Sequence, residues 1–264
     1  MLPLAGSTPP TTADEFARAL ADGLRAAGLA PRAVEADGGA WPEVARLVVD
    51  LTGAEVTRAT RLPVVSERVG AGVKVAEVEL RASPGRFEKT PIHLSMRLAG
   101  VVADFERTAD GALALALASA AGGELTAHIS LTDLEAALHA LAVALGAKQG
   151  VEAKTTRLEI EAPTPRSLVF RAAVTAKVFI MTTTVKVRGR VDLDEQLNAR
   201  VSGLVAEGEG MMAGMVESAL RPRLAKIEAQ TFALGAFVTA GLHVSDATVS
   251  VDDAMHLHAT LGGA

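Results

Sequence analysis

The chain has 264 residues, of which 49% are hydrophobic and 22% are charged, and its formal net charge is −5 at pH 7. This composition excludes a disordered chain, and the net negative charge argues against a nucleic-acid partner. Without Cys, the chain has no disulfide, thiolate metal site or cysteine nucleophile. With no Tyr and one Trp, the stacking surfaces of grooves for single-stranded nucleic acid or sugar are not expected either.

The N-terminal sequence argues against an export signal. Residues 1–12 contain three prolines and no basic residue ahead of an apolar run, so they do not form a signal peptide pattern. No stretch approaches the roughly 18 uninterrupted apolar residues of a membrane span. As written, the chain is expected to be soluble and cytoplasmic, or periplasmic or in the cell envelope if an export signal was removed.

The first predicted element is an amphipathic helix. Thr12 and Glu15 form a capping-box pattern, Phe16 begins an apolar stripe at helical spacing, and Gly28 ends it. Residues 31–39 are predicted to be a linker. Pro42 is predicted to open a short helix, for which a strand is the alternative.

Alternating residues then predict several strands and a second helix. Strands are expected at residues 73–80, where a change of parity predicts an irregularity, at 92–98, and at 125–131. Gly122 and Gly123 are predicted to form a turn. Thr132 and Glu135 make a second capping-box pattern, which predicts a helix over residues 134–145.

The longest alternating pattern runs from Leu168 to Val205. Its first part places apolar residues at even positions, namely Leu168, Phe170, Ala172, Val174, Ala176, Val178 and Ile180. After Thr182–Thr184 the apolar residues occupy odd positions, from Val185 to Val201. Because side chains alternate between the two faces of a strand, this pattern predicts two long neighbouring strands joined by a bulge or tight turn.

Apolar residues spaced by three or four from Glu209 to about Leu234 predict a long helix, kinked at Pro222, that covers the sheet. Strands follow at Leu242–Val251 and Met255–Leu261. The expected fold is α+β, with a long, highly curved antiparallel sheet wrapped around this C-terminal helix and with additional shorter helices. We expect residues 1–40 to form an N-terminal helix and linker and residues 41–264 to form one elongated domain, whose halves 41–150 and 151–264 are a candidate internal duplication.

Catalytic and metal-binding patterns are weak. His256 and His258 would share one face of a strand, but no third or fourth metal ligand is apparent. Asp192 and Asp194 are expected to be solvated on a polar strand face. No known catalytic spacing occurs, so we expect no enzyme, no catalytic residue, no metal and no cofactor. A lipid hydrolase using Ser202 or Ser218 is a weaker hypothesis.

Soft and aromatic side chains near two element ends favour a hydrophobic-ligand site. Its predicted lining is Phe170, Val178, Ile180, Met181, Met211, Met212, Met215, Ala219 and Phe232. A basic row on the second long strand, formed by Lys186, Arg188 and Arg190, is a candidate contact for a lipid headgroup or a membrane surface. The alternative is a structural or protein-interaction module with a solid core and no ligand.

The order of these features resembles that of the LmeA-like phospholipid-binding proteins, a family similar to the tubular lipid-binding (TULIP) superfamily. The resemblance covers about Ala45 to Leu261 and is carried by GGELTAHISLTDLEAAL, VKVRGRVDLDEQLNARVSGL, MVESALRPRLAKIEA and GLHVSDATVSV. It implies a curved sheet around a long helix, an apolar groove for a phospholipid or fatty acid, and peripheral membrane contact. The family offers no catalytic residue to transfer, and this chain lacks the export signal usual for it.

Overall fold

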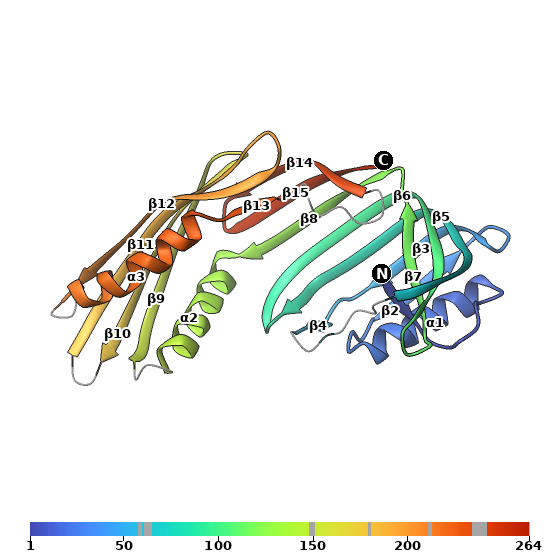
Figure 1. The fold of residues 1–264 in the computed structure, drawn as a ribbon, viewed down its shortest axis with the longest axis horizontal. Coiled ribbons are helices and arrows are strands. Elements are labelled where there is room, and N and C mark those ends of the chain that lie inside the picture. The colour runs from blue at the N-terminus through green and yellow to red at the C-terminus, as the bar shows by residue number, and fades with distance from the viewer. Residues whose placement is uncertain are drawn as a thin grey trace. The chain divides into compact units, whose positions relative to one another are not determined.

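The structure, a computed structural model, describes residues 1–57, 60, 65–147, 151–178, 181–210, 213–233 and 242–263. Strands account for most of these residues, and three helices lie among them (Figure 1). The predicted α+β class is therefore confirmed.

The chain divides into two compact units. Unit 1 comprises Met1–His128, Ala236–Asp246 and His258–Ala264, and unit 2 comprises Ile129–Gly235 and Ala247–Leu257. The first crossing between them thus lies at residues 128–129, inside a strand. That residues 41–150 and 151–264 arose by internal duplication stays a prediction.

The larger sheet has ten strands among the described residues, with seven in the order β14-β15-β8-β6-β5-β3-β2; β4 pairs with β5, and β7 pairs with β6 and β1. Their bounds are β1 Leu2–Leu4, β2 Ala33–Asp37, β3 Glu43–Asp50, β4 Glu55–Val56, β5 Val65–Phe87, β6 Thr90–Thr108, β7 Leu113–Ser119, β8 Gly122–Ser130, β14 Leu242–Val251 and β15 Ala254–Gly263. Because β3 and β4 run parallel to β5, this sheet is mixed and not antiparallel as predicted.

Two local expectations in this sheet are corrected. The segment after Pro42 is strand β3, which was the alternative to a helix. Gly122 and Gly123 do not form a turn but open β8. A Cβ at Gly123 would lie 2.2 Å from the carbonyl oxygen of Arg97, so the absence of a side chain lets β8 approach β6 closely.

The predicted irregularity in residues 73–80 is confirmed. Val75 and Val78 are both buried, while the two residues between them are exposed. On the partner strand β6, Leu98 and Val101 are likewise buried on either side of two exposed residues, of which Gly100 has a φ of +58°. Both strands therefore change parity together, and the core face stays apolar.

Helix α1, Ala13–Ala26, lies over the core of unit 1. The Thr12 side chain caps it by accepting a hydrogen bond from the Glu15 amide at 3.2 Å. Glu15 reaches back to the amide of Thr11, not of Thr12, so the capping box is shifted by one residue. The buried cluster of this unit is Leu4, Phe16, Leu20, Leu24, Leu29, Val44, Leu47, Val49, Val73, Val75, Val78, Leu98, Val101, Ala103, Phe105, Leu113, Leu115, Ala120 and Leu242.

Unit 2 contains a five-stranded sheet in the order β13-β12-β11-β10-β9. Its strands are all antiparallel to their neighbours and comprise β9 Val151–Thr164, β10 Ser167–Val178, β11 Met181–Leu193, β12 Asn198–Glu209 and β13 Thr231–Ala233. The parity change near the threonines arises from a tight connection, since Val178 pairs with Met181.

The second long strand was predicted to run from Val185 to Val201, and this is wrong. The chain turns after Leu193, where the Asp194 carboxylate accepts hydrogen bonds from the amides of Gln196 and Asn198 at 2.9 and 2.8 Å. Leu197 adopts a left-handed φ of 59° in this turn. The turn links β11 to β12, so the predicted second strand is two strands, and the whole pattern from Leu168 to Val205 contains three.

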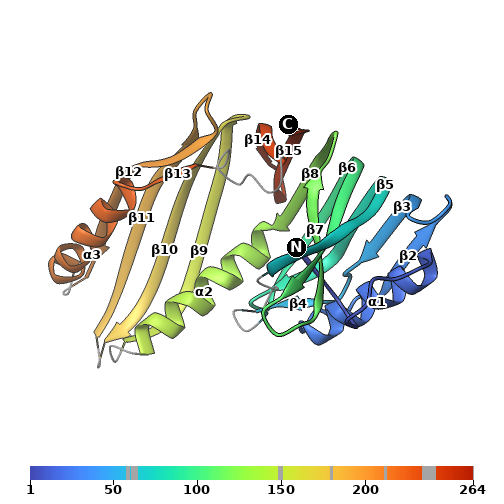
Figure 2. The ribbon, with the colours of Figure 1, turned by 45° about the vertical axis from the view of Figure 1, so that its right-hand side comes forward.

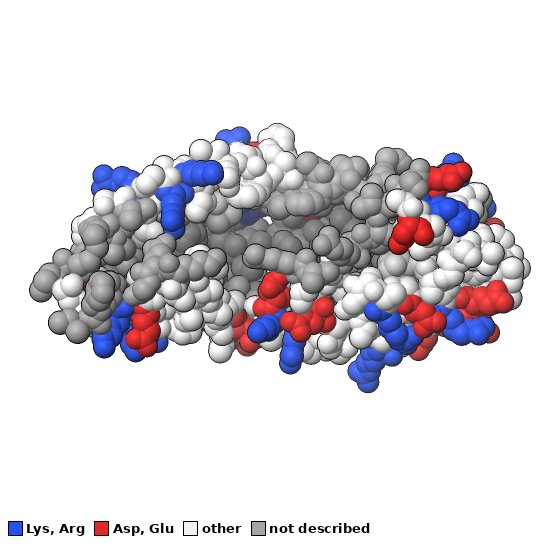
Figure 3. Space-filling model, turned by 60° about the horizontal axis from the view of Figure 1, so that its bottom comes forward, with Lys and Arg blue, Asp and Glu red and all other residues white. Residues whose placement is uncertain are grey.

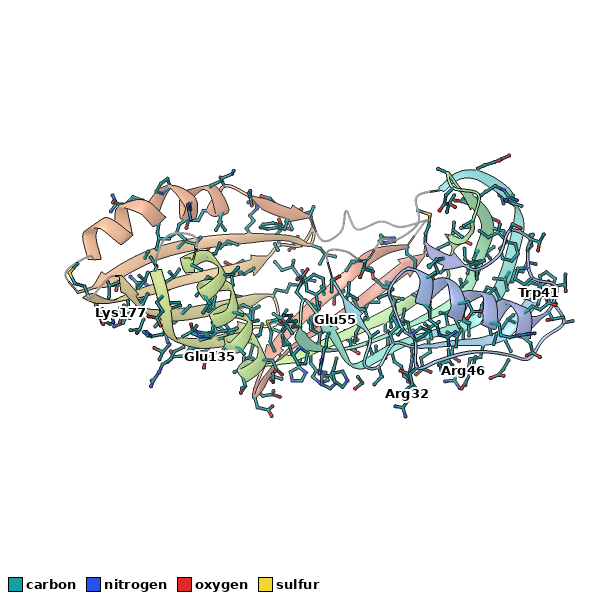
Figure 4. All side chains as sticks on the ribbon, turned by 90° about the horizontal axis from the view of Figure 1, so that it is seen from below. Arg32, Trp41, Arg46, Glu55, Glu135 and Lys177 are labelled. Carbon is teal, nitrogen blue, oxygen red and sulfur yellow. The ribbon has the colours of Figure 1, made fainter. Side chains whose placement is uncertain are left out.

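Helix α2, Leu131–Ala147, is capped by Ser130, two residues before the predicted cap Thr132. Ser130 accepts a hydrogen bond from the Asp133 amide at 3.0 Å. Glu135 does not complete a capping box with Thr132; its carboxylate accepts a hydrogen bond from the Leu158 amide of β9 at 2.8 Å (Figure 4).

Helix α3, Ala213–Glu228, is shorter than the expected helix from Glu209 to Leu234, because residues up to Glu209 belong to β12 and Thr231 begins β13. Pro222 lies inside it, as predicted. Helix α3 packs on β12 and touches β11. A long C-terminal helix enclosed by the sheet is therefore not shown.

Candidate functional site

One face of the unit 2 sheet is apolar across its four long strands. Strand register places Ala172 opposite Leu158 and Val187, and it places Val187 opposite Ala206. We call this surface the apolar face; it consists of Leu158, Ile160, Phe170, Ala172, Val174, Val185, Val187 and Ala206. All eight side chains are half-buried, and none is fully buried.

Helices α2 and α3 lie on this face at its two sides. From α2, Nδ1 of His139 lies 3.1 Å from Oγ1 of Thr156, which shares the face with Leu158. On the other side, Leu224 of α3 lines a recess of about 200 Å³ together with Leu204 and Ala206 of β12. Figure 2 shows β10 and β11 between the two helices. The centre of the apolar face therefore lies between α2 and α3.

Helix α2 adds further apolar surface. It contains no fully buried residue, and Leu141 and Leu145 are 54% and 50% exposed. Val143 is exposed as well. Several large apolar side chains exposed on one helix are typical of a surface that contacts an apolar partner.

The two units differ sharply in how they bury apolar residues. Every member of the buried cluster lies in unit 1. In the described part of unit 2, the fully buried apolar residues are Ile129, Ala176, Leu197, Ala247 and Ala254, of which three are alanines. Among the described residues of unit 2, the apolar face thus has no close-packed cover of the kind seen in unit 1.

The structure places only part of the predicted ligand lining. Phe170 lies on the apolar face, and Met181 is half-buried at the start of β11. Phe232 lies in β13 opposite Ala199 and is 48% exposed. Val178 belongs to β10, and Met215 and Ala219 belong to α3, but their side chains are outside the described part, as are the residues Ile180, Met211 and Met212 entirely.

The predicted lining did not include four central residues of the apolar face, namely Ala172, Val174, Val185 and Val187. The alternation of these residues predicted strands, and the same alternation indicates that they share one apolar face. What the pattern did not reveal is that this face is only half-covered.

The predicted basic row lies on the opposite face of β11, where Lys186, Arg188 and Arg190 are all exposed. Arg190 pairs with Asp192 at 2.7 Å, and Arg188 lies 3.5 Å from Glu207. A hydrogen bond to Glu209 raises the pKa of Lys186. Figure 3 shows such mixtures of basic and acidic residues along its lower margin.

The histidines and carboxylates do not assemble a metal centre in the part of the chain that the structure describes. His93 stacks on His128, its cross-strand neighbour, with ring centroids 4.3 Å apart. Oγ of Ser83 lies 2.8 Å from Nδ1 of His93. Ser202, a nucleophile considered for a hydrolase, is exposed on β12 opposite Arg190.

Asp252, between β14 and β15, provides a pH-dependent prediction. The Ala254 amide and His256 donate hydrogen bonds to its carboxylate at 2.9 and 3.0 Å, and they help to lower its pKa to about 2. Because this pKa is below the ordinary value of about 3.9, the ionised group stabilises the fold above pH 4, and this contribution is lost as the pH falls towards 2.

We expect an NMR titration of the Asp252 carboxyl carbon to have its midpoint at about 2. In the variant His256→Gln the midpoint should rise but stay below the ordinary value, since the Ala254 amide is the largest cause of the shift. A wild-type midpoint near 3.9 would contradict the hydrogen-bonded geometry.

None of the helices in the described ranges is long and apolar enough to cross a membrane. A search of protein-family models, of curated proteins and of solved structures gives no match to this chain.

Proposed function

We propose that the protein binds a phospholipid or fatty acyl chain on the apolar face of unit 2 and that it acts by binding or carrying this ligand, without catalysis. The observation that supports the proposal is the half-buried state of all eight side chains of the apolar face. A surface of this kind is typical of an interaction site for an apolar partner.

The energetics favour an acyl chain. Each CH₂ group that leaves water contributes about 0.8 kcal/mol, and fully burying a valine side chain contributes about 1.5–3 kcal/mol relative to an exposed one. An acyl chain over Val174, Val185 and Val187 would therefore gain from its own burial and from completing the burial of the valines.

The dimensions are also suitable. Strand β10 has 12 residues, which at about 3.3 Å per residue span about 40 Å. The neighbouring strand β11 has 13 residues and runs alongside over the whole of β10. This continuous strip is long enough for an extended acyl chain.

A TULIP-like arrangement is part of this proposal. The antiparallel sheet of unit 2 and the placement of α2 and α3 on one of its faces support it. The shorter α3 differs from the long enclosed helix that the resemblance implies. We therefore propose a groove bordered by two helices.

The test compares two identical substitutions on opposite faces of the sheet. Val187→Asp places a carboxylate in the centre of the apolar face, where a bound acyl chain would bury it. We expect at least a tenfold loss of fatty acid or phospholipid binding, because a buried, unpaired charge is strongly unfavourable. Native mass spectrometry and uptake of a fluorescent fatty acid would measure the loss.

The matched control is Val205→Asp. Val205 is 38% exposed and lies opposite Arg188 on the other face, where it lines a hollow among basic side chains, so the comparison uses the fatty acid, which this variant should take up like the wild type. Circular dichroism would establish that both variants fold. Equal binding by Val187→Asp would refute the placement of the ligand, and a wild type that takes up no lipid would favour the structural or interaction module.

A further inference from the structure

The polar face of the unit 2 sheet contains a cavity of about 360 Å³. Ala173 of β10 lies between Arg157 of β9 and Lys186 of β11 in the strand register. In the neighbouring row, Arg171 lies opposite Arg188. The small methyl group of Ala173 thus leaves a hollow among four long basic side chains, which we call the basic cavity.

The basic cavity has more positive than negative charge. Its lining includes Arg157, Arg171, Lys186 and Arg188, but only two carboxylates, Glu159 and Glu207. This excess of cations arises in a chain whose net charge is negative. Glu161 and Glu209, which lie outside the lining, also pair with Arg171 and Lys186, so the cation that remains without a carboxylate partner among the described residues is Arg157.

The arginines of the cavity keep donors available. Arg171 lies 3.7 Å from both Glu159 and Glu161, and Arg188 lies 3.5 Å from Glu207. These distances exceed the roughly 2.7–2.9 Å of a charge-assisted hydrogen bond. Arg157 forms no ion pair with the carboxylates in the described ranges, so its guanidinium is free to bind an anion.

We infer that the basic cavity binds the phosphate group of an anionic ligand. A guanidinium presents parallel N–H donors that match two phosphate oxygens, and several arginines around one hollow make this recognition stronger than that of scattered charges. The phosphate belongs either to a soluble phosphate monoester or to a phospholipid headgroup at a membrane surface.

This site is separate from the proposed lipid groove. The sheet lies between the basic cavity and the apolar face, so one lipid whose tail lies over Val187 does not place its headgroup beside Arg157. Loss of acyl-chain binding in Val187→Asp would leave the phosphate site intact. The two proposals can therefore fail independently.

The experiment measures binding of glycerol phosphate by ³¹P NMR and binding to phosphatidylcholine vesicles with and without phosphatidic acid. Arg157→Gln removes the unpaired cation, and Ala173→Leu fills the hollow without changing charge. We expect each to weaken binding about tenfold or more, since hydrogen bonds to charged groups are among the strongest. Circular dichroism checks that both variants fold.

The matched control is Arg190→Gln. Arg190 lies on the same face of β11 but pairs with Asp192 and does not line the cavity. Its replacement should change binding by about twofold or less, because its charge is already paired and screened. Saturable binding of glycerol phosphate would identify a soluble monoester, and binding only to vesicles with phosphatidic acid would identify a headgroup.

The inference is overturned if neither probe binds the wild type. It is also overturned if Arg190→Gln weakens binding as much as Arg157→Gln, because general surface charge would then account for the effect. Unchanged binding in Ala173→Leu would likewise exclude the hollow as the site.

Discussion

Replacing Phe16 with alanine is expected to lower the free energy of unfolding of unit 1 by about 3–5 kcal/mol. Phe16 of α1 is 0% exposed and belongs to the buried cluster of unit 1, and its ring centroid lies 5.8 Å from that of Trp41. The substitution removes an entire buried ring and leaves a cavity that the neighbouring strands cannot fill without distortion. The effect should therefore be near the upper end of single-residue changes.

Trp41 allows the unfolding of unit 1 to be measured by itself. It is the one tryptophan of the chain and lies in unit 1, so urea unfolding followed by tryptophan fluorescence reports on this unit. The matched control is Phe232→Ala, which removes an aromatic ring that is half-exposed in unit 2. We expect the control to leave the fluorescence transition unchanged. A similar shift in both variants would contradict the assignment of the core to unit 1.

Asp50→Ala is expected to destabilise unit 1 by about 1.5–3 kcal/mol at neutral pH, because it removes hydrogen bonds to a buried, charged carboxylate. The buried carboxylate accepts from the Thr52 amide at 2.9 Å and pairs with Arg81 at 3.1 Å. Burial alone would raise the pKa of Asp50, but hydrogen bonds from Thr52 and the charge of Arg81 together lower it below the ordinary value.

This shift determines the pH dependence. A carboxylate with a lowered folded-state pKa stabilises the fold above the unfolded pKa of about 3.9, and its contribution disappears as the pH falls through the folded value. The difference between wild type and Asp50→Ala should accordingly be constant near pH 7 and shrink below pH 4. Urea unfolding at several pH values would measure it.

Asp22→Ala provides the control for Asp50→Ala. Asp22 forms an exposed ion pair with Arg25 at 2.6 Å on the surface of α1. Exposed pairs contribute little, so its loss should change stability by no more than about 0.5 kcal/mol. Equal effects of the two substitutions would show that burial of Asp50 does not determine its contribution.

Strands were the most predictable part of the fold, because alternation depends on local geometry. The predicted strand at residues 242–251 has the bounds of β14. Alternation failed at Asp194, where a turn of four residues preserves odd and even positions and so conceals the break between β11 and β12. The hydrogen-bonding Asp194 and the following Asn198 were the available turn signal.

Helix length was predictable only in part. Leu204, Ala206 and Gly208 continue strand β12 up to Glu209, the first residue of the predicted helix, so the predicted start was too early. Pairing order was not predictable at all, since alternation does not encode which strand lies beside another. The parallel neighbours β3 and β5 are an example.

For both candidate sites, the pattern within each strand was predictable, but the packing and the strand register were not. The apolar alternation of β10 and β11 was visible in the sequence, but its partial cover depends on where α2 and α3 pack. The basic row of β11 was also visible. Arg157 and Arg171 join it only through the register of β9 and β10 with β11, which brings residues from separate strands around Ala173.

The hydrogen bond from Leu158 to Glu135 has a consequence for solubility. Strand β9 is the outermost strand of its sheet, and an outermost strand with free amides can pair with another chain. Glu135 occupies one of these amides, and Glu228 of α3 accepts a hydrogen bond in the same way from the Leu204 amide of β12 at 2.7 Å. Leu204 lies beyond Asn198–Arg200, the part of β12 that pairs with β13. The two glutamates therefore occupy amides through which a second chain could otherwise extend this sheet.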